Sequence, residues 1–314
     1  MFVLAHLSDP HLGPLPRVRY RELFSKRLIG FANWHIGGRR ERHNMPCLAA
    51  LVKDLLAQNP DHIACTGDLA VIGLDAEYMP ARAFLQTLGT PEHVSLVPGN
   101  HDAYVRSTAN HPQLHWSEYM TGDGERVEGD PPFPYLRRRG PIGIVGITSA
   151  VPTFLHSAQG RVGRDQMLRA RKMLRQLREE GLFRVVMIHH PPDGTGDLFR
   201  RLVDARRVKR ALLREGAELV LHGHNHIVER TTLPGLDGPV PVVGVPSASS
   251  APGPAYKAGA YNLFFIDGEP GKWTCEMVIR GFGEAGTEIA ERQRLMLYET
   301  PSERKPAFQR NPAP

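Results

Sequence analysis

The fold is decided by the stretch Phe2-Val3-Leu4-Ala5-His6-Leu7-Ser8-Asp9-Pro10-His11, in which an apolar run is followed directly by polar residues. The apolar run has the length and residue types of a buried β-strand. Asp9 and His11 follow where the strand ends. They are two residues apart, so on a turn both side chains can face one ion. The same arrangement recurs along the chain.

Four further apolar runs end in a similar burst of polar residues. In chain order these ends are Thr66-Gly67-Asp68, Pro98-Gly99-Asn100-His101-Asp102, His189-His190-Pro191-Pro192 and His222-Gly223-His224-Asn225-His226. Ligands of α/β sheets gather beyond the carboxyl ends of the strands, so we expect all five stretches to converge on one edge. The glycines at 67, 99 and 223 are expected to let the backbone turn sharply beside these side chains.

Predicted strands and helices alternate over the first two thirds of the chain, which indicates an α/β architecture with buried sheets. The predicted strands are Phe2–Leu7, His62–Thr66, His93–Val97, Ile142–Thr148, Arg184–Ile188 and Glu218–Leu221. The predicted helices are Asn44–Gln58, Asp75–Leu88, Arg164–Glu180 and Asp204–Glu215.

The pattern changes after Gly223, where strands follow one another without helices. These predict a second, antiparallel sheet added to the first, which gives a sandwich with helices outside. The strands concerned are Ile227–Leu233, Val240–Val245, Tyr261–Ile266 and Trp273–Ile279. A helix is expected over Glu284–Tyr298, followed by a mobile tail over Pro301–Pro314 that holds four prolines.

Composition excludes several classes of protein. Hydrophobic residues make up 41% of the 314 residues and charged residues 23%, the balance of a folded globular chain rather than a disordered one. No apolar run approaches the ~20 residues that a membrane-spanning helix needs. Cys47, Cys65 and Cys275 are too few and too scattered for a disulfide framework. With no signal peptide in the first residues, we expect a cytoplasmic protein.

Positive charge is concentrated in one segment. Residues 17–43 hold eight arginines and lysines against two glutamates, which accounts for the whole net charge of +6. A nucleic-acid binder needs a broader basic face, so nucleic acid is not the expected partner. Phe24, Leu28 and Phe31 fall at helical spacing, which predicts a short amphipathic helix in this basic insert, residues 14–43. Three interpretations stay open: a helix packed on the body, a lid that attracts an anionic substrate, or peripheral contact with an anionic membrane through 17–43.

The side chains at the strand ends suit divalent metals, because carboxylate, amide oxygen and imidazole bind manganese, iron or zinc. A single catalytic zinc takes about three protein ligands, so the seven candidate ligands named below predict two ions bridged by one carboxylate. Such a pair activates a water molecule for attack on phosphorus. The candidate ligands are Asp9, His11, Asp68, Asn100, His189, His224 and His226. His101 is expected to donate a proton to the leaving group, with Asp102 fixing its orientation.

As a set, these motifs resemble the calcineurin-like metallophosphoesterase family. The family's order is Asp-x-His, Gly-Asp, Gly-Asn-His-Asp/Glu, a His, and Gly-His-x-His, and all are present across residues 9–226. The resemblance implies a four-layer αββα sandwich of two mixed β-sheets flanked by helices. It implies a first metal site of Asp9, His11, Asp68 and His226. It implies a second site of Asp68, Asn100, His189 and His224, with Asp68 as the bridge and His101 as general acid or phosphate contact.

The resemblance also implies a reaction. The bacterial phosphodiesterase branch is the part of the family that looks most like this chain, because of His189-His190-Pro191-Pro192 together with Gly223-His224-Asn225-His226. The pattern of that branch favours His189 over His190 as the ligand. We therefore expect a metal-activated hydroxide to attack a small phosphodiester in line, with a cyclic nucleotide, a glycerophosphodiester or a lipid-like diester as substrate. A nuclease or phosphomonoesterase of the same fold is an alternative, and so is a metal-binding scaffold without catalysis.

In this interpretation residues 1–283 form the metallophosphoesterase domain, and residues 284–314 form the C-terminal helix and tail. A homo-oligomer is left open. Two other histidines are not expected to bind metal. His222 is expected to pack beside the ligands, and His43 has no partner motif.

Overall fold

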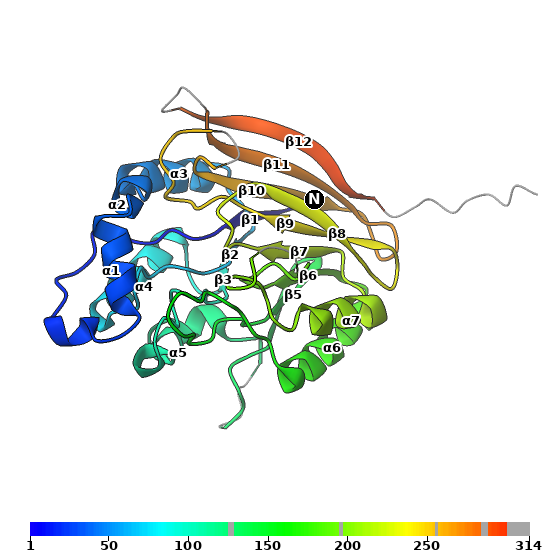
Figure 1. Cartoon of the computed structure of the whole chain (residues 1–314). Helices are drawn as coiled ribbons and strands as arrows, with labels where there is room; N and C mark the ends of the chain where they lie inside the picture. The colour runs from blue at the N-terminus through cyan, green and yellow to red at the C-terminus, as the bar shows by residue number, and fades with distance from the viewer. Residues whose placement is uncertain (125–128, 195–196, 255–256, 284–287, 300–314) are drawn as a thin grey trace, which may run out of the picture.

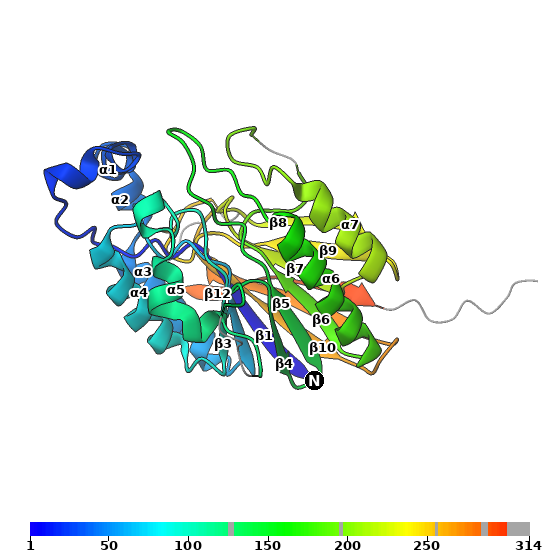
Figure 2. The same ribbon diagram turned by 90° about the horizontal axis from the view of Figure 1, so that it is seen from below.

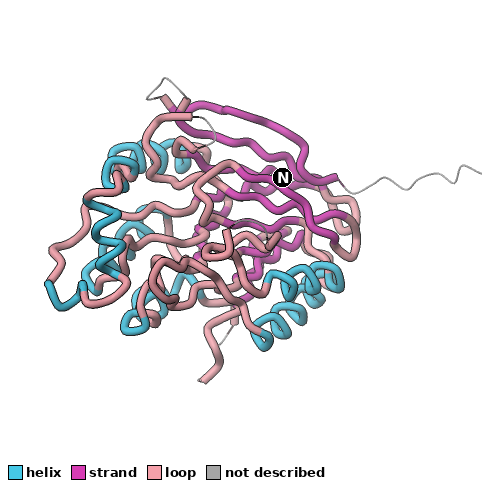
Figure 3. Tube along the Cα trace, in the orientation of Figure 1, coloured by secondary structure: helices cyan, strands magenta, loops and turns pink. Residues whose placement is uncertain are grey.

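The computed structural model describes residues 1–124, 129–194, 197–254, 257–283 and 288–299. Within these residues two six-stranded sheets lie face to face, and helices cover both outer sides (Figures 1 and 3). Both sheets mix parallel and antiparallel neighbours. The expected α/β sandwich of two mixed sheets between helices is therefore confirmed.

The first sheet has the order β12-β11-β10-β1-β2-β3. Its strands β1, β2 and β3 are parallel, whereas β10, β11 and β12 are added antiparallel on the other side of β1. The strands are β1 (Phe2–Leu7), β2 (His62–Cys65), β3 (Val94–Leu96), β10 (Ala260–Asp267), β11 (Thr274–Phe282) and β12 (Ile289–Glu299).

The second sheet has the order β4-β5-β6-β7-β9-β8. Four neighbouring strands, β5, β6, β7 and β9, are parallel, and β4 and β8 are antiparallel edges. The strands are β4 (Tyr135–Arg139), β5 (Ile142–Gly146), β6 (Phe183–Met187), β7 (Leu219–His222), β8 (Glu229–Pro234) and β9 (Pro239–Gly244).

The helices divide between the two outer faces. Helices α3 and α4 pack against the first sheet, and α6 and α7 pack against the second (Figure 1). The longer helices are α1 (Arg27–His35), α3 (Met45–Ala57), α4 (Asp75–Leu88), α6 (Arg164–Glu179) and α7 (Ala205–Glu215). The shorter ones are α2 (Arg39–Arg42), α5 (His111–Trp116) and the 3-10 turns η1 (Tyr20–Leu23), η2 (Arg106–Thr108) and η3 (Ser117–Met120).

Alternation along the strands of the second sheet builds two cores at once. In β6, Val185 and Met187 enter the core between the sheets, whereas Val186 faces the core under α6 and α7. In β7, Leu219 faces the first core and Val220 the second. These strands are apolar on both faces, as expected for parallel strands covered on both sides.

The strands after Gly223 do not form a sheet of their own, so that prediction is wrong. Strand β9 lies parallel to β7, and β8 pairs with β9, so both extend the second sheet. Strands β10 and β11 instead continue the first sheet beyond β1. The hydrogen-bonding edges of β1 and β7 need partners, and the last third of the chain supplies one to each.

The helix predicted over 284–298 is also wrong for the residues described there. Residues 289–299 form β12, which pairs antiparallel with β11, and Leu295 and Leu297 pack on the core from it. The segment is rich in helix-forming residues, but the free edge of β11 offers a ladder of hydrogen bonds that outweighs this propensity. Residues 284–287 and the tail over 300–314 lie outside the described residues.

The basic insert packs differently from the helical stripe predicted for it. Phe24 and Leu28 are 88% and 54% exposed, whereas α1 buries Arg27, Gly30 and Trp34. The interpretation that the apolar stripe packs on the body is therefore wrong for Phe24 and Leu28. The buried guanidinium of Arg27 donates to the carbonyls of Ile72 and Gly73, and these bonds decide which side of α1 faces inward.

Within the described residues, none of these helices combines the length and apolar character needed to cross a bilayer.

Candidate metal centre

The polar ends of five strands meet at one edge of the sandwich. Seen from below, β1, β5, β6 and β7 run toward the same side of the molecule (Figure 2). Asp9 follows β1, Asp68 follows β2, and Asn100 follows β3 in the first sheet. His189 and His224 follow β6 and β7 in the second. The donors thus come from both sheets, and the distances below show that they form one cluster.

The first group of donors surrounds His226. Its Nε2 lies 3.0 Å from Oδ1 of Asp9 and 3.2 Å from Nε2 of His11. Oδ2 of Asp68 lies 3.8 Å from Nε2 of His11. One donor atom from each of these four residues lies within 4.8 Å of all the others, which is the spacing of a metal site. These are the four residues that the family resemblance implies for the first ion.

The second group lies on the other side of Asp68. Nε2 of His189 is 3.4 Å from Oδ2 of Asp68 and 3.2 Å from Oδ1 of Asn100. Oδ1 of Asn100 is also 2.9 Å from Nδ1 of His224. The same carboxylate oxygen of Asp68 faces both His11 and His189, so Asp68 occupies the position between the two groups.

Hydrogen bonds to backbone carbonyls show that this arrangement suits cations. Nδ1 of His11 donates to the carbonyl of Ala70 at 3.1 Å, and Nδ1 of His189 donates to that of Thr66 at 2.7 Å. Nε2 is then the ring nitrogen left to face the site, and for His189 it faces carboxylate and amide oxygens, which are acceptors. Oxygens gathered in this way favour positive charge at that point, supplied by a protonated His189 or by a metal ion in its place. The residues therefore fit a pair of metal ions.

Burial and mutual charge set the pKa values of the cluster. Burial lowers the pKa of His189, but the carboxylate of Asp68 outweighs it and raises the value to about 9. Burial raises the pKa of Asp68, but the nearby histidines, His189 foremost, hold it well below its usual range. Burial, and then the charges of His190 and His189, lower the pKa of His224. At neutral pH His189 is therefore largely imidazolium, and a bound cation would replace its Nε2 proton, because an ionised carboxylate and a neutral imidazole are the forms that bind metal.

The backbone at the ligands is unusual. A positive φ is uncommon outside glycine, and such conformations cluster at functional sites. Five of the seven predicted ligands adopt one, with φ of 54°, 37°, 56°, 70° and 55° respectively: Asp9, His11, Asp68, His224 and His226. The chain therefore holds strained conformations where the donors converge.

The neighbouring glycines have two different functions. Gly67 has a φ of 95°, so it makes the sharp turn expected of it. Gly99 and Gly223 have no such φ, although each begins a turn, in which its carbonyl accepts the backbone N–H of Asp102 and of Asn225 respectively. They provide space instead: a Cβ on Gly99 would overlap the carboxylate of Asp68, and one on Gly223 would overlap that of Asp9.

His101 lies beside the cluster, with its ring centroid 4.7 Å from that of His11. Its backbone N–H donates to Oδ1 of Asp68 at 2.7 Å, and its Nδ1 donates to the carbonyl of Val71 at 2.5 Å. Because Nδ1 holds the proton, Nε2 carries one only in the imidazolium form. Burial lowers the pKa of His101 to about 4, against the opposing attraction of Asp68.

Asp102 does not contact the His101 ring in the way predicted. Its buried carboxylate accepts the backbone N–H groups of Asp68, Ala70 and Gly99, at 2.8, 2.9 and 2.8 Å. The carbonyl of Val71, rather than Asp102, fixes the orientation of the His101 ring. Asp102 therefore braces the two loops that carry Asp68 and Asn100.

Three further histidines surround the ligands. Both ring nitrogens of His190 are engaged, by Ser149 at 2.8 Å and the carbonyl of Ala158 at 3.0 Å, so His189 is the one that faces Asp68. His222 is fully buried, as expected. Sequence reasoning missed His43, which lies within 4.8 Å of the donor atoms of His11 and His226.

His43 is held by contacts that leave little signal in the sequence. Its Nδ1 lies 2.8 Å from the hydroxyl of Ser249, and its ring stacks on that of Trp34 with centroids 5.9 Å apart. An isolated bridge to Ser250 brings it to the site. Its one local marker is its place just before Asn44, the residue that caps α3.

A cavity of about 270 Å³ opens directly over the metal ligands. Asp68, Asn100, His101, His224 and His226 lie in its floor and walls. The basic insert forms part of its rim with Lys26 and Arg39, and Arg200 lies on the rim as well. Nζ of Lys26 donates to the hydroxyl of Thr153 at 2.6 Å, which links α1 to the loop after β5.

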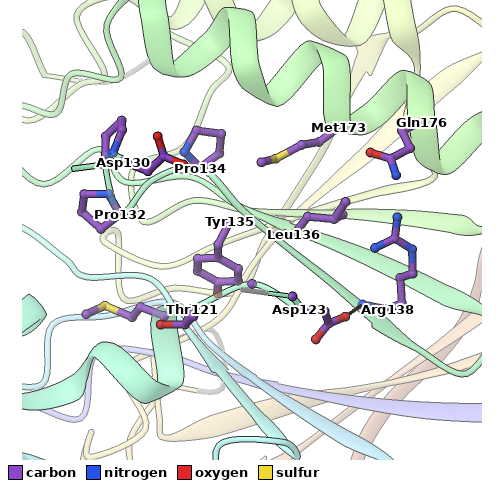
Figure 4. Close-up of a pocket in the computed structure, with 14 residues that line it drawn as sticks. Thr121, Asp123, Asp130, Pro132, Pro134, Tyr135, Leu136, Arg138, Met173 and Gln176 are labelled. Atoms are coloured by element: carbon purple, nitrogen blue, oxygen red, sulfur yellow. Dashed lines mark hydrogen bonds between the residues drawn. The ribbon is translucent and has the colours of Figure 1, made fainter. Parts of the chain in front are cut away.

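Another cavity, of about 330 Å³, lies between β4, α6 and the loop before β4 (Figure 4). Its ionisable side chains are Asp123, Asp130, Tyr135 and Arg138, and Oδ2 of Asp123 accepts the backbone N–H of Arg138 at 2.6 Å. The described residues that line it include no histidine and no cysteine. It therefore lacks the histidines that line the cavity beside Asp68.

Comparison with known proteins agrees with this geometry. The family model of the calcineurin-like phosphoesterases matches residues 2–228. The fold is similar to that of a dimetal phosphatase from Danio rerio, with a TM-score of 0.59 and 12% identity, over 95% of this chain and 99% of that one. It is also similar to the purple acid phosphatase PPD1 from yellow lupin, Lupinus luteus, with a TM-score of 0.55 and 12% identity, over 92% of this chain and 52% of that one. No curated protein sequence matches the chain.

Proposed function

This chain belongs to the calcineurin-like phosphoesterase family and is a metal-dependent phosphoester hydrolase, and we propose that it acts on small phosphodiesters. The observation that carries the proposal is the convergence of the metal donors and His101 on one cavity of about 270 Å³. That volume is of the order of small-molecule sites, which suits a phosphate with short substituents better than a polymer.

Two groups of residues would hold the ions. Once bound, the ions would polarise the phosphoryl oxygens and lower the pKa of the attacking water. One ion would be held by Asp9, His11, Asp68 and His226, and the other by Asp68, Asn100, His189 and His224.

His101 is the proton donor in this proposal. Its Nδ1 is used by Val71, so Nε2 is the atom available to a substrate in the cavity. A phosphodiester releases an alkoxide, which needs a proton as the bond to phosphorus breaks. The negative charge of a bound phosphate would raise the pKa of His101 from its low value and favour the imidazolium that donates this proton.

Lys26 and Arg39 supply positive charge on the rim of the cavity. Burial lowers the pKa of Lys26 to about 8, against the attraction of Asp68, so the amine is largely protonated at neutral pH. This supports the interpretation of the basic insert as a lid that attracts an anionic substrate. The choice of a diester itself rests on the resemblance of His189–Pro192 and Gly223–His226 to the phosphodiesterase branch.

A substrate panel on purified protein of measured metal content tests the proposal. We expect kcat/KM for bis(p-nitrophenyl) phosphate, cyclic nucleotides or glycerophosphodiesters to exceed that for p-nitrophenyl phosphate by about tenfold, and a strong chelator to abolish turnover. A preference for the monoester would contradict the diester proposal. Cleavage of DNA or RNA would favour a nuclease. A chain that binds two ions but turns over no ester would favour the alternative of a metal-binding scaffold without catalysis.

A pair of lysine variants tests the lid. Lys26→Met should raise KM for the diester about tenfold, because a partly buried charge in the cavity is lost. Lys53→Met removes an exposed lysine of α3 and should leave KM unchanged. Equal behaviour of the two variants would show that the insert does not attract the substrate.

A further inference from the structure

Exposed apolar side chains are concentrated on three segments near the mouth of the cavity. Tyr20, before α1, is 89% exposed. In the loop after β5, Phe154 is 85% exposed, with Leu155 beside it at 58%. In the loop before α7, Phe199 is 59% exposed. Large apolar groups at this level of exposure mark interaction surfaces when they gather in one region.

Hydrogen bonds hold the three segments next to one another. Nζ of Lys26, at the start of α1, donates to the carbonyl of Ser157 at 2.5 Å. The backbone N–H of Ala158 donates to the carbonyl of Phe199 at 2.7 Å. Figure 2 shows α1 and α2, the green loop after β5 and the yellow-green loop before α7 rising on the same side of the molecule. We call this side the mouth face.

Positive charge accompanies the apolar groups. Arg19 and Arg21 flank Tyr20 in the chain and are exposed. Arg40 and Arg200 are exposed on the neighbouring segments. The insert that forms much of this face holds the whole net charge of the chain, +6. Apolar residues that project between arginines are complementary to a surface that is apolar below and negatively charged above.

We propose that the mouth face docks on the surface of an anionic phospholipid bilayer. Phe24 and Phe154 would enter the boundary between headgroups and acyl chains, Tyr20 would lie at the headgroup level, and the arginines would contact lipid phosphates. The apolar groups stand on three separate segments, two of which carry exposed arginines, and this suits a fluid surface better than a protein partner with one fixed shape. The proposal does not depend on the proposed phosphodiesterase activity, because docking is measured without turnover.

Sedimentation with vesicles tests the proposal on the full chain. We expect binding to vesicles of phosphatidylcholine with about 30% phosphatidylglycerol, weaker binding to phosphatidylcholine alone, and loss of binding as salt is raised. No binding to the anionic vesicles at low salt would overturn the proposal. Equal binding to both kinds of vesicle would also overturn it, because the docking would then not depend on negatively charged lipid.

A pair of apolar double variants locates the docking face. Phe24→Ser with Phe154→Ser should weaken vesicle binding by at least about tenfold, since each ring removes most of its apolar area from water on docking. Met79→Ser with Leu213→Ser replaces two residues that are 57% and 54% exposed on α4 and α7, and should leave binding unchanged. All four residues are exposed, so folding is preserved, and circular dichroism checks it.

Charge variants test the second half of the proposal. Arg19→Gln with Arg21→Gln should weaken binding about 25-fold, because each basic residue near an anionic surface contributes about fivefold. Arg206→Gln with Arg210→Gln removes the same charge from exposed positions on α7. If the α7 pair weakens binding as much as the insert pair does, the attraction is general and the mouth face is not the docking surface.

Discussion

Oδ1 of Asn100 lies 2.9 Å from Nδ1 of His224, although the two residues come from different sheets. Nε2 of His224 donates to the carbonyl of Arg200 at 2.8 Å, so Nδ1 of the neutral ring is an acceptor. Two acceptors at this distance repel each other, and a cation beside them that both bind removes the repulsion. We therefore expect Asn100→Ala to lower the metal content from about two ions per chain to about one, measured by elemental analysis.

Asn110→Ala is the matched control, because Asn110 is exposed before α5. It should retain both ions and full activity. If Asn100→Ala keeps two tightly bound ions, the second metal site is not built as described.

His101→Gln should separate chemistry from metal binding. The backbone N–H of His101 that holds Asp68 is kept in this variant, so the metal content should not change. Loss of a general acid should lower kcat for a diester by about 10²–10⁴-fold. A diester whose leaving group is a nitrophenolate needs little protonation and should lose less than an alkyl diester. His93→Gln is the control, because His93 is an exposed histidine just before β3. Equal losses for the two diesters would argue against a proton-donor role.

Asp102→Asn should act through structure rather than through proton transfer. Its carboxylate accepts three backbone N–H groups, and the amide of asparagine would turn a donor toward at least one of them. We expect the free energy of unfolding in urea to fall by about 1–3 kcal/mol, and metal affinity to fall with it. The ratio of activity on alkyl and nitrophenyl diesters should stay that of the parent. A changed ratio with unchanged stability would return Asp102 to the catalytic role first predicted for it.

The sequence predicts the residues of the candidate site more completely than it predicts the pairing of the strands. Asp68 and Asn100 each follow an apolar run, and parallel strands bring such ends together wherever they lie in the chain. No comparable rule marks His43, because it reaches the site through a single bridge to Ser250. The rim could not be predicted either: Phe199 and Ser157 lie in loops, and their hydrogen bonds exist only in the folded chain.

The wrong predictions about the fold arise from which strands pair with one another, which local sequence does not show. The sequence of β9 predicts a strand, but its own residues do not indicate that β7 is its neighbour. The composition of β12 favours a helix, whereas pairing with the edge of β11 decides that it is a strand. Local patterns indicate which residues can form an element, and pairing across the sheet selects among the options.

The ion pair between Asp54 and Arg280 makes stability depend on pH. Oδ1 and Oδ2 of Asp54 lie 2.9 Å from Nη2 and Nε of Arg280, and Tyr261 donates to Oδ2 at 2.5 Å, so α3 is tied to β10 and β11. Burial raises the pKa of Asp54, but the hydrogen bonds from Arg280 and Tyr261 outweigh it and hold the pKa below its ordinary value of 3.8.

A carboxyl whose pKa is lower in the folded state stabilises the fold above its ordinary value, and this contribution is lost as the pH falls through the lowered value. Asp54→Asn should therefore reduce the free energy of unfolding by about 1–2 kcal/mol at neutral pH. The difference from the parent should shrink below the ordinary value of 3.8, as Asp54 itself becomes protonated. Urea titrations across the acid range measure it, with Asp165→Asn, an exposed carboxylate of α6, as the control. A difference that stays constant down to the lowest pH at which the chain is folded would mean that Asp54 acts by packing and not by charge.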